Sequence, residues 1–403
     1  MRVRRTLLIT VNGVDRPGVS SAIFRACGSH PVRVIDTEQL VIRGRLVLAV
    51  LLEGTQDDAD LDACAKEVDQ VASAMGMDVE VAIGEPESAG LPDRRFRVTV
   101  LGSPLTPDAV SRIASEVATH GGNIDRIHRI ADYPVTALAF DGSGVDPDVL
   151  RRPLAEISSD SGVDIAIQDQ SLEARGQYLV VMDVDSTVIQ DEVIDLLADR
   201  AGRLSEVAAI TRSAMEGDID FSQALRQRVA LLEGLPVSVL DEVRTAITLT
   251  PGARTLCRTL KRLGYRIALV SGGFTAVIQP IADDLGVDVL RANDLDVVDG
   301  RLTGQVRGPV IDRVAKREVL EELARTYQIP RRRTVAIGDG ANDVDMLAAA
   351  GLGIAFNAKP VTRAIADASV NVPYLDSVLF LLGITRAEIE EADAREGTPT
   401  PRP

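Results

Sequence analysis

The sequence predicts an α/β protein: a parallel β-sheet that carries a helical insertion, preceded by two smaller α+β domains. Two observations support this fold class. A unit of about 90 residues occurs twice in the first part of the chain, and apolar runs alternate with helical segments in the rest, as in βαβ units. The chain of 403 residues is also too long for one ordinary hydrophobic core. We expect domains at residues 1–84, 95–168 and 177–390, followed by a disordered tail at 391–403.

The repeated unit opens with a short apolar strand. The first copy begins at Leu8–Val11 and the second at Arg97–Val100, and a glycine follows two residues after each. A helical pattern with apolar residues four positions apart comes next, and then two further strand-like runs. With a second helix and a closing strand, the predicted order is βαββαβ. The polar segment Gly84–Arg95 is the expected linker between the copies.

Three fully apolar runs in the C-terminal part predict parallel strands: Tyr178–Met182, Arg266–Val270 and Thr334–Ile337. Unbroken apolarity is typical of strands that are covered on both faces of a sheet. Polar residues stand at the ends of these runs, namely Asp183, Ser271 and Asp339. Because ligands bind beyond the carboxyl ends of strands in open α/β sheets, this edge of the sheet is the predicted functional site.

Two segments interrupt this alternation of strands and helices. A helical insertion at about residues 190–249 lies between the first two strands, where it is placed to cap the site. The segment Leu295–Val306, with Asp299-Gly300 at its centre, predicts a small hairpin. The final EGTPTPRP is rich in Pro and Thr, which favours disorder.

Composition excludes several classes of function. A net charge of −16 argues against a nucleic-acid partner, because phosphate backbones bind basic surfaces. No apolar run approaches the roughly 20 residues of a membrane span, and breaks at Asn12 and Asp15 argue against a signal peptide. Three scattered cysteines predict neither a disulfide framework nor a metal cluster. We therefore expect a cytoplasmic protein that does not bind membranes.

A pair of carboxylates, Asp183 and Asp185, follows a predicted buried strand directly. Other D-x-D pairs in this acidic chain lack that context. Two carboxylates at a strand end repel each other and are costly to desolvate. A divalent cation resolves this conflict, and Mg²⁺ prefers oxygen ligands. With Asp339 as a third carboxylate at the same edge, the sequence predicts a Mg²⁺ site.

Two further features are candidates for binding a phosphate group. In Ser271-Gly272-Gly273, a strand meets a helix through a turn whose backbone N–H groups can reach a phosphate. Lys316 lies on a predicted helix. Each signal is weak by itself, because Ser-Gly turns are common and helix lysines are usually exposed. They gain weight from sharing the sheet edge with the carboxylates.

The ordered set DVDST, SGG, a helix lysine and GDGANDVDML resembles the haloacid-dehalogenase-like phosphotransferases, whose sheet is Rossmann-like. Within that superfamily, Glu192 and the segment MEGDIDFSQALRQRV are similar to the phosphoserine phosphatases. The N-terminal repeats resemble ACT domains, which are ferredoxin-like amino-acid-sensing modules. Their signature in the first copy is Asp15-Arg16-Pro17-Gly18-Val19.

The resemblance implies a mechanism with an aspartyl-phosphate intermediate. Asp183 is the expected nucleophile and Asp185 the expected general acid and base. Mg²⁺ would be held by Asp183, the main-chain carbonyl of Asp185 and Asp339. The phosphoryl oxygens would be held by Ser271, Gly272 and Lys316, and Asn342 and Asp343 would orient either Lys316 or the phosphate and metal-bound water.

The resemblance also implies how O-phospho-L-serine is selected. Glu192 would bind the ammonium group and Arg228 the carboxylate, with Met215 and Phe221 as apolar walls of the pocket. L-Serine is the implied effector at the first ACT-like copy, near Asp15 and Gly18. The second copy has Asp108 where Gly18 would lie, so equivalent binding by both copies is not expected. Because edge strands of such repeats often pair between chains, we expect a homodimer.

Two alternative functions remain open at this point. In the first, the same fold transfers the phosphoryl group to another alcohol, such as homoserine, because the aspartyl intermediate is common to both reactions. In the second, the chain is an amino-acid-responsive regulator with a vestigial catalytic domain. The complete set of Asp183, Asp185, Ser271, Lys316 and Asp339 argues against that loss of function.

Overall fold

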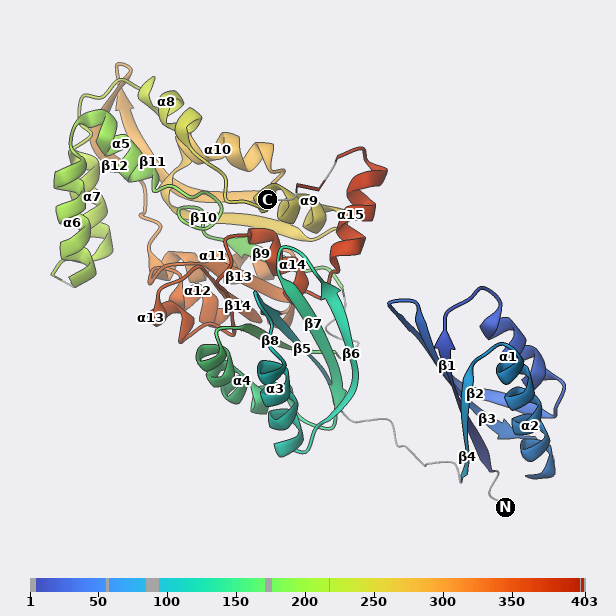
Figure 1. The fold of residues 1–403 in the computed structure, drawn as a ribbon. Coiled ribbons are helices and arrows are strands. Elements are labelled where there is room, and N and C mark those ends of the chain that lie inside the picture. The colour runs from blue at the N-terminus through green and yellow to red at the C-terminus, as the bar shows by residue number, and fades with distance from the viewer. Residues whose placement is uncertain are drawn as a thin grey trace. The chain divides into compact units, whose positions relative to one another are not determined.

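The computed structural model describes residues 5–55, 58–84, 94–170, 176–216, 218–398 and 400–401; the side chains of residues 58, 59, 215 and 216 are not included. It contains two four-stranded sheets and one seven-stranded sheet (Figure 1), which confirms the predicted fold class. The chain divides into two compact units, Met1–Leu91 and Pro92–Pro403, which we describe separately. Within the described residues, no helix is long and apolar enough to cross a membrane.

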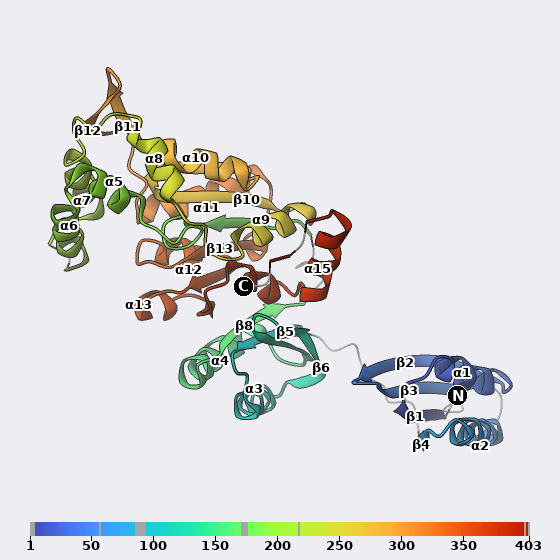
Figure 2. The same ribbon diagram turned by 45° about the horizontal axis from the view of Figure 1, so that its top comes forward.

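The first unit is one copy of the repeat, and its elements have the predicted βαββαβ order. They are β1 (Thr6–Val14), α1 (Val19–Gly28), β2 (Val32–Ile42), β3 (Arg45–Gly54), α2 (Asp58–Ala74) and β4 (Asp78–Gly84). The sheet is antiparallel, in the order β2-β3-β1-β4, and both helices cover one face of it (Figures 1 and 2). Alternation explains the packing: Leu7, Ile9 and Val11 are buried beneath the helices, whereas Leu8 points to the other face and is exposed.

The second repeat has the same topology and belongs to the second unit. Its elements are β5 (Arg95–Gly102), α3 (Pro107–Thr119), β6 (Asn123–Ala131), β7 (Thr136–Ser143), α4 (Pro147–Ser161) and β8 (Asp164–Asp169), in the sheet order β6-β7-β5-β8. The sheet face away from its helices packs on the C-terminal domain through small side chains, among them Ala137, Ala139 and Ala166. Asp164 strengthens this contact by accepting hydrogen bonds from the backbone (2.9 Å) and side-chain (2.5 Å) nitrogens of Asn371.

The seven-stranded sheet forms the core of the C-terminal domain. Its strands are β9 (Leu179–Met182), β10 (Arg266–Phe274), β11 (Val289–Val298), β12 (Arg301–Arg307), β13 (Thr334–Gly338), β14 (Leu352–Phe356) and β15 (Ala368–Val370), in the order β12-β11-β10-β9-β13-β14-β15. All neighbours are parallel except β11 and β12, which form the predicted hairpin around Asp299-Gly300. The sequence patterns did not predict the strands β14 and β15.

Helices cover both faces of this sheet, as expected for βαβ units. They are α9 (Ala253–Arg262), α10 (Thr275–Asp284), α11 (Arg313–Thr326), α12 (Val344–Ala349), α13 (Pro360–Arg363), α14 (Val378–Leu381) and α15 (Arg386–Arg395), with short 3₁₀ turns at Arg331–Arg333 and Leu375–Ser377. Two buried clusters result, one on each side of β9, β10 and β13.

The insertion between β9 and β10 is a helical cap. It contains α5 (Val193–Ala201), α6 (Leu204–Glu216), α7 (Phe221–Ala230) and α8 (Val239–Ala246). Its two ends are joined where Ile189 pairs with Leu249. A second bridge, between Pro236 and Arg301, fastens the cap to β12, and Figures 1 and 2 show α5, α6 and α7 grouped beside the β11–β12 hairpin.

The expected disordered tail at 391–403 is wrong in its first part, because α15 continues to Arg395. The helix starts with a capping box in which Thr385 and Glu388 bond each other's backbone N–H. Its Asp393 side chain is fully buried and accepts hydrogen bonds from Arg258 (2.9 and 2.6 Å) and Arg262 (2.5 Å). The described residues beyond the helix also continue this network, since Thr400 donates to Asp393 (2.6 Å).

We predict that Asp393→Ala lowers the free energy of unfolding by about 2–3 kcal/mol, because it leaves two arginines without their shared buried anion. Burial alone would raise the pKa of Asp393, but hydrogen bonds from Arg258, Thr400 and Arg262 lower it to about 2. Its stabilising effect is therefore complete above about pH 4 and is lost as the pH falls toward 2.

Urea unfolding of Asp393→Ala and the unaltered protein across this pH range measures the effect. The matched control is Glu391→Gln in the same helix, which removes only an exposed pair with Arg395 and should cost less than about 0.5 kcal/mol. Equal losses in the two variants would contradict the prediction.

Candidate active site

Three parallel strands end at one edge of the sheet and bring the predicted site residues together. β9 lies between β10 and β13 and is paired in register with both. Asp183 follows β9 directly, and its N–H donates to the carbonyl of Ile337 on β13 (2.9 Å). Ser271 lies in β10 beyond the last residue paired with β9, and Asp339 follows β13. The topology explains why residues more than 150 positions apart meet here.

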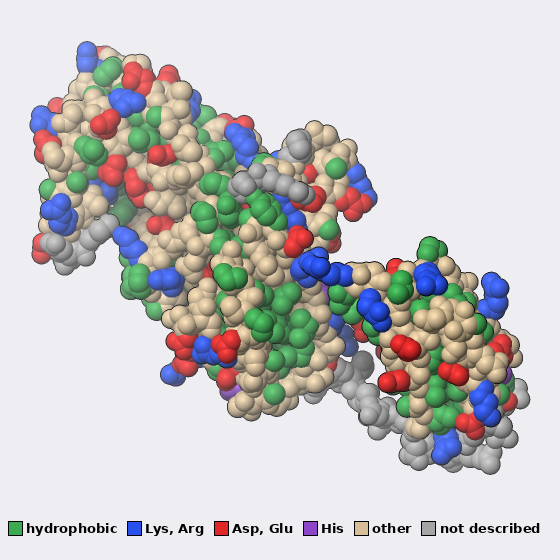
Figure 3. All heavy atoms as spheres, viewed as in Figure 1, with side chains coloured by type: hydrophobic (Ala, Val, Ile, Leu, Met, Phe, Trp, Pro, Cys, Tyr) green, Lys and Arg blue, Asp and Glu red, His purple; other side chains and the backbone are tan. Residues whose placement is uncertain are grey.

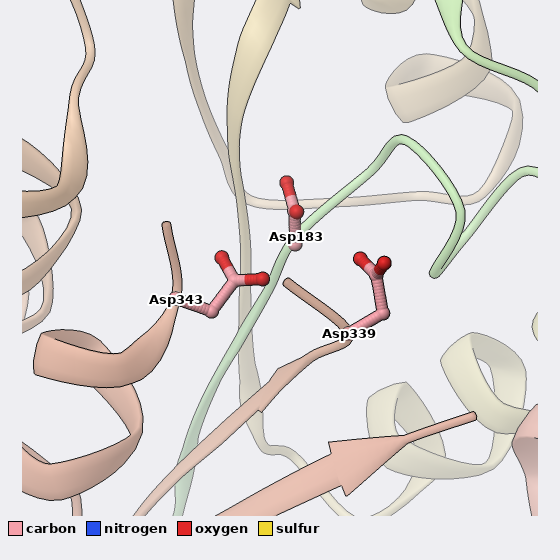
Figure 4. A group of neighbouring side chains, drawn as sticks. All are labelled: Asp183, Asp339 and Asp343. Carbon is pink, nitrogen blue, oxygen red and sulfur yellow. The ribbon is translucent and has the colours of Figure 1, made fainter. Parts of the chain in front are cut away.

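Asp183, Asp339 and Asp343 form a carboxylate cluster at this edge, with one oxygen of each lying within 4.8 Å of the others. In Figure 4, Asp183 stands between Asp343, at the start of α12, and Asp339, just beyond β13. Burial, and then the neighbouring Asp343, raise the pKa of Asp183 well above its ordinary value. The same two causes raise the pKa of Asp339 to about 6. The carboxylates therefore lie in surroundings that penalise their negative charge.

Lys316 supplies a positive charge in the middle of this cluster. The side chain has no exposed surface, and its ammonium is 2.7 Å from one oxygen of Asp183 and 2.7 Å from one oxygen of Asp343. Burial alone lowers the pKa of Lys316, but the two carboxylates together raise it above its ordinary value. Lys316 lies at the start of α11. Asp312 caps this helix by accepting a hydrogen bond from Ala315 N–H (2.9 Å).

Glycines allow the loop after β13 to fold around Asp343. The second oxygen of Asp343 accepts a hydrogen bond from Gly340 N–H (3.0 Å). A Cβ at Gly338 would lie 2.4 Å from Cγ of Asp343, so a side chain cannot be accommodated there. Asn342 lies against Gly340, where a Cβ would meet its side-chain oxygen. Asp343 thus contacts both Lys316 and Gly340, each through a different carboxylate oxygen.

The donor set of this cluster fits Mg²⁺. Three carboxylates against one ammonium leave excess negative charge in a largely buried site, and all the donors are hard oxygens. Both oxygens of Asp343 already accept hydrogen bonds, one from Lys316 and one from Gly340. Asp183 and Asp339 are therefore the side chains best placed to hold the ion. The side chain of Asp185 lies outside this cluster.

Asp185 connects the cap to the Ser271–Gly273 turn, the candidate phosphate-binding turn. One of its oxygens accepts a hydrogen bond from Val193 N–H at the start of α5 (2.8 Å), and the other from the hydroxyl of Ser271 (2.8 Å). The Ser271 hydroxyl also accepts from Gly273 N–H (2.7 Å). Burial is the main influence on Asp185 and raises its pKa, although these hydrogen bonds act in the opposite direction. A raised pKa suits the general acid that the sequence predicts at this position.

The cap brings opposite charges over the site. Glu192 immediately precedes α5 and accepts a hydrogen bond from Ser186 (2.9 Å), which adopts the left-handed conformation with φ 59°. Close packing, and then Asp185, raise the pKa of Glu192, although the residue keeps an exposed surface. Arg228, in the last turn of α7, makes long hydrogen bonds to Ala224 (3.4 Å) and Thr211 (3.5 Å). Burial lowers the pKa of Arg228, and the attraction of Glu192 partly offsets this.

Phe221 lies against the Ser271–Gly273 turn, because a Cβ at Gly272 would lie 3.0 Å from its ring. Met215 belongs to α6, but its side chain is outside the described part of the structure.

In the first unit, Gly18 caps α1 with φ 96°. In the second repeat, α3 begins at Pro107, so that Asp108 is already helical. The two repeats therefore differ at the expected ligand-binding loop.

Two residues near the site, Thr187 and Asn293, were not predicted from the sequence. Thr187 donates to Asp339 (3.4 Å), and its place within DVDST was a usable signal. Asn293 on β11 is 1% exposed and donates to the carbonyl of Gly272 (2.9 Å). Its only signal was an amide within an otherwise strand-like run, which does not reveal its partner.

Comparison with known proteins matches three parts of the chain to known families. Residues 180–348 match a family described as haloacid dehalogenase-like hydrolase, and residues 5–82 and 95–168 each match ACT domain families. A phosphoserine phosphatase of Streptomyces coelicolor is 51% identical to this chain, over 96% of this chain and 94% of the relative. The chain belongs to the phosphoserine phosphatase family.

Other members of the phosphoserine phosphatase family match over similar lengths. The phosphoserine phosphatase of Mycobacterium tuberculosis is 48% identical, over 98% of this chain and 97% of its own length. Among solved structures, a probable phosphoserine phosphatase from Vibrio cholerae is 33% identical and covers 73% of this chain and 88% of its own, with a TM-score of 0.57. The resemblance seen in the motifs is thereby confirmed, including the two ACT domains.

Proposed function

We propose that this chain hydrolyses O-phospho-L-serine to L-serine and phosphate with the help of Mg²⁺, as the last step of serine biosynthesis in the cytoplasm. The observation that carries the proposal is the arrangement of charges: Glu192 and Arg228 on the cap, above a buried lysine–carboxylate cluster and a phosphate-binding turn. An amino-acid phosphate ester carries an ammonium, a carboxylate and a phosphate, and each has a group of opposite charge here. The relatives named phosphoserine phosphatase support the same assignment.

In the first half-reaction, a carboxylate oxygen of Asp183 attacks phosphorus while the bond from phosphorus to the serine oxygen breaks. Asp185, in its protonated form, donates a proton to the departing oxygen, and the raised pKa that burial gives this carboxyl favours that role. In the second half-reaction, Asp185 takes a proton from water as the water oxygen attacks phosphorus. The bond between phosphorus and Asp183 breaks, which releases phosphate and restores both carboxyl groups.

The phosphoryl oxygens would be held by Lys316, the Ser271 hydroxyl and the N–H of Gly272. Mg²⁺ bound by Asp183 and Asp339, with the main-chain carbonyl of Asp185, would offset the repulsion between the nucleophile and the phosphate. Asp343 contributes indirectly, because it fixes the ammonium of Lys316 through a 2.7 Å contact.

Substrate selection would depend on the cap. Glu192 would bind the ammonium of the serine moiety, and the guanidinium of Arg228 its carboxylate in bidentate geometry. Phe221, with Met215, would form the apolar wall of the pocket. The contact of Phe221 with the phosphate-binding turn supports a closed cap that excludes water during the first half-reaction.

Phosphate release from O-phospho-L-serine, measured with Mg²⁺ and with EDTA, tests the proposed reaction. Asp183→Asn should lose at least about 10⁴-fold in kcat, because an amide cannot attack phosphorus. Asp345→Asn is the control and should keep its activity, because Asp345 lies in the first turn of α12 and pairs with the half-exposed Arg313. Full activity of Asp183→Asn, or undiminished turnover in EDTA, would contradict the mechanism.

Adding L-serine to the same assay tests whether the first ACT domain, near Asp15 and Gly18, regulates the enzyme.

Arg228→Ala should lower kcat/KM for phosphoserine by about 100-fold, because the substrate carboxylate loses its charged partner. The same variant should change p-nitrophenyl phosphate turnover by less than about threefold, since this ester has no carboxylate. The matched control is Arg226→Ala, an exposed arginine on the same helix. Equal losses on the two esters would refute the assignment of Arg228.

We also propose that the protein is a homodimer joined through the first repeat. β2 is an edge strand of its sheet, and five large aliphatic side chains on it are 44–62% exposed: Val34, Ile35, Leu40, Val41 and Ile42. Hydrophobic side chains of this unit are visible at its surface in Figure 3. The corresponding edge strand of the second repeat, β6, differs in its apolar surface, because its exposed large aliphatic side chain is Ile127 (49%), against five on β2.

Lysines at two β2 positions, Leu40→Lys with Ile42→Lys, should convert the dimer to a monomer, because burying two ammonium groups in the interface is costly. Sedimentation velocity measures the change. The control is Val149→Lys, an equally exposed aliphatic residue on α4. If the unaltered protein sediments as a monomer at every concentration, the dimer proposal is wrong.

A further inference from the structure

The strand β10 leaves its ladder with β11 at the phosphate-binding turn. The two strands pair from Ala268 to Val270, and pairing resumes only at Phe274, opposite Asn293. Ser271, Gly272 and Gly273 therefore lie outside the regular hydrogen-bond ladder. A buried carbonyl group that has no partner in a ladder needs a hydrogen-bond donor from elsewhere. In this structure the carbonyl of Gly272 receives its hydrogen bond from a side chain.

That side chain is Asn293, which is 1% exposed. Its amide nitrogen donates to the Gly272 carbonyl (2.9 Å), and its amide oxygen accepts from Ile311 N–H (2.8 Å). Its main-chain carbonyl accepts from the hydroxyl of Thr275 at the start of α10 (3.3 Å). The amide meets both needs, because one partner needs a donor and the other an acceptor.

The two partners of Asn293 lead to different parts of the active site. Ile311 immediately precedes Asp312, the cap of the helix that delivers Lys316. The Gly272 carbonyl belongs to the same peptide as Gly273 N–H, which donates to the hydroxyl of Ser271. Ser271 in turn donates to Asp185. One buried amide therefore joins the phosphate-binding turn to the approach to the lysine helix.

We propose that Asn293 is a positioning residue for phosphoryl transfer. It touches no substrate; it sets the distance and orientation between the Ser271–Gly273 turn and the start of α11. The inference rests on the proposed function only in that this edge of the sheet binds a phosphate ester. It does not depend on the serine moiety, which the cap would recognise. Displacement of a catalytic group by about 1 Å can cost about 100-fold in rate, so loss of the two Asn293 side-chain hydrogen bonds should produce a measurable fall in kcat.

The test compares two substitutions with a control, using phosphoserine and p-nitrophenyl phosphate. Asn293→Leu keeps the size but removes both hydrogen bonds, and should lower kcat by about 100-fold on both esters. This pattern differs from that of Arg228→Ala, which affects phosphoserine alone. Thr303→Val is the control: it removes a side-chain hydrogen bond to Asp296 (3.0 Å) in the same β11–β12 hairpin and should keep full activity.

Asn293→Asp separates positioning from stability. It keeps the acceptor for Ile311 N–H, but an ionised carboxylate cannot donate to the Gly272 carbonyl. When the introduced carboxyl is protonated it regains a donor, so the activity of this variant relative to the unaltered protein should rise as the pH falls. A residue that acts only on stability would show no such dependence in measurements made well below the unfolding temperature.

Thermal unfolding of each variant corrects kcat for the folded fraction. The proposal is wrong if Asn293→Leu, so corrected, stays within about twofold of the unaltered protein on p-nitrophenyl phosphate. If Asn293→Leu does not fold, a relative activity of Asn293→Asp that is independent of pH overturns it. Turnover of p-nitrophenyl phosphate without turnover of phosphoserine would refute the proposed function while leaving this test intact.

Discussion

The active site is organised around one buried cation. The ammonium of Lys316 has no exposed surface and is tolerated because Asp183 and Asp343 lie 2.7 Å away. This requirement fixes three elements relative to one another: the end of β9, the start of α12 and the first turn of α11. A different interaction holds each element in place. The hydrogen-bond ladder with β13 holds the end of β9, the absence of a Cβ at Gly338 leaves room for Asp343 at the start of α12, and Asp312 caps α11.

Much of this arrangement could be predicted from local patterns. Fully apolar runs identified β9, β10 and β13, since strands buried on both faces need no polar residues. The parallel topology then placed Asp183, Ser271 and Asp339 at one edge. β14 and β15 went unnoticed: the sequence LGIAF of β14 contains a glycine that weakens the strand pattern, and β15 is only three residues long.

What could not be predicted depends on contacts between distant residues. The pairing of Asp343 with Lys316 joins two helix starts that no periodicity connects. Asn293 is one amide in a strand, and its importance comes from a turn on the neighbouring strand that needs a donor. The helix α15 has little amphipathic character of its own and depends on Asp393 meeting Arg258 and Arg262, more than 130 residues earlier. The composition of this segment predicted a disordered tail, but ion pairs with residues far away in the sequence stabilise a helix over its first part.

The two ACT domains illustrate how one fold serves different surroundings. In the second repeat, alanines on the open sheet face allow close packing on the C-terminal domain, and Asp164 is hydrogen-bonded to Asn371. The same packing covers α14, whose four residues are completely buried. A recombinant fragment beginning near residue 176, after the second repeat has ended, would expose this hydrophobic surface and be prone to precipitate. A fragment that begins near residue 94 keeps this surface covered by the second repeat.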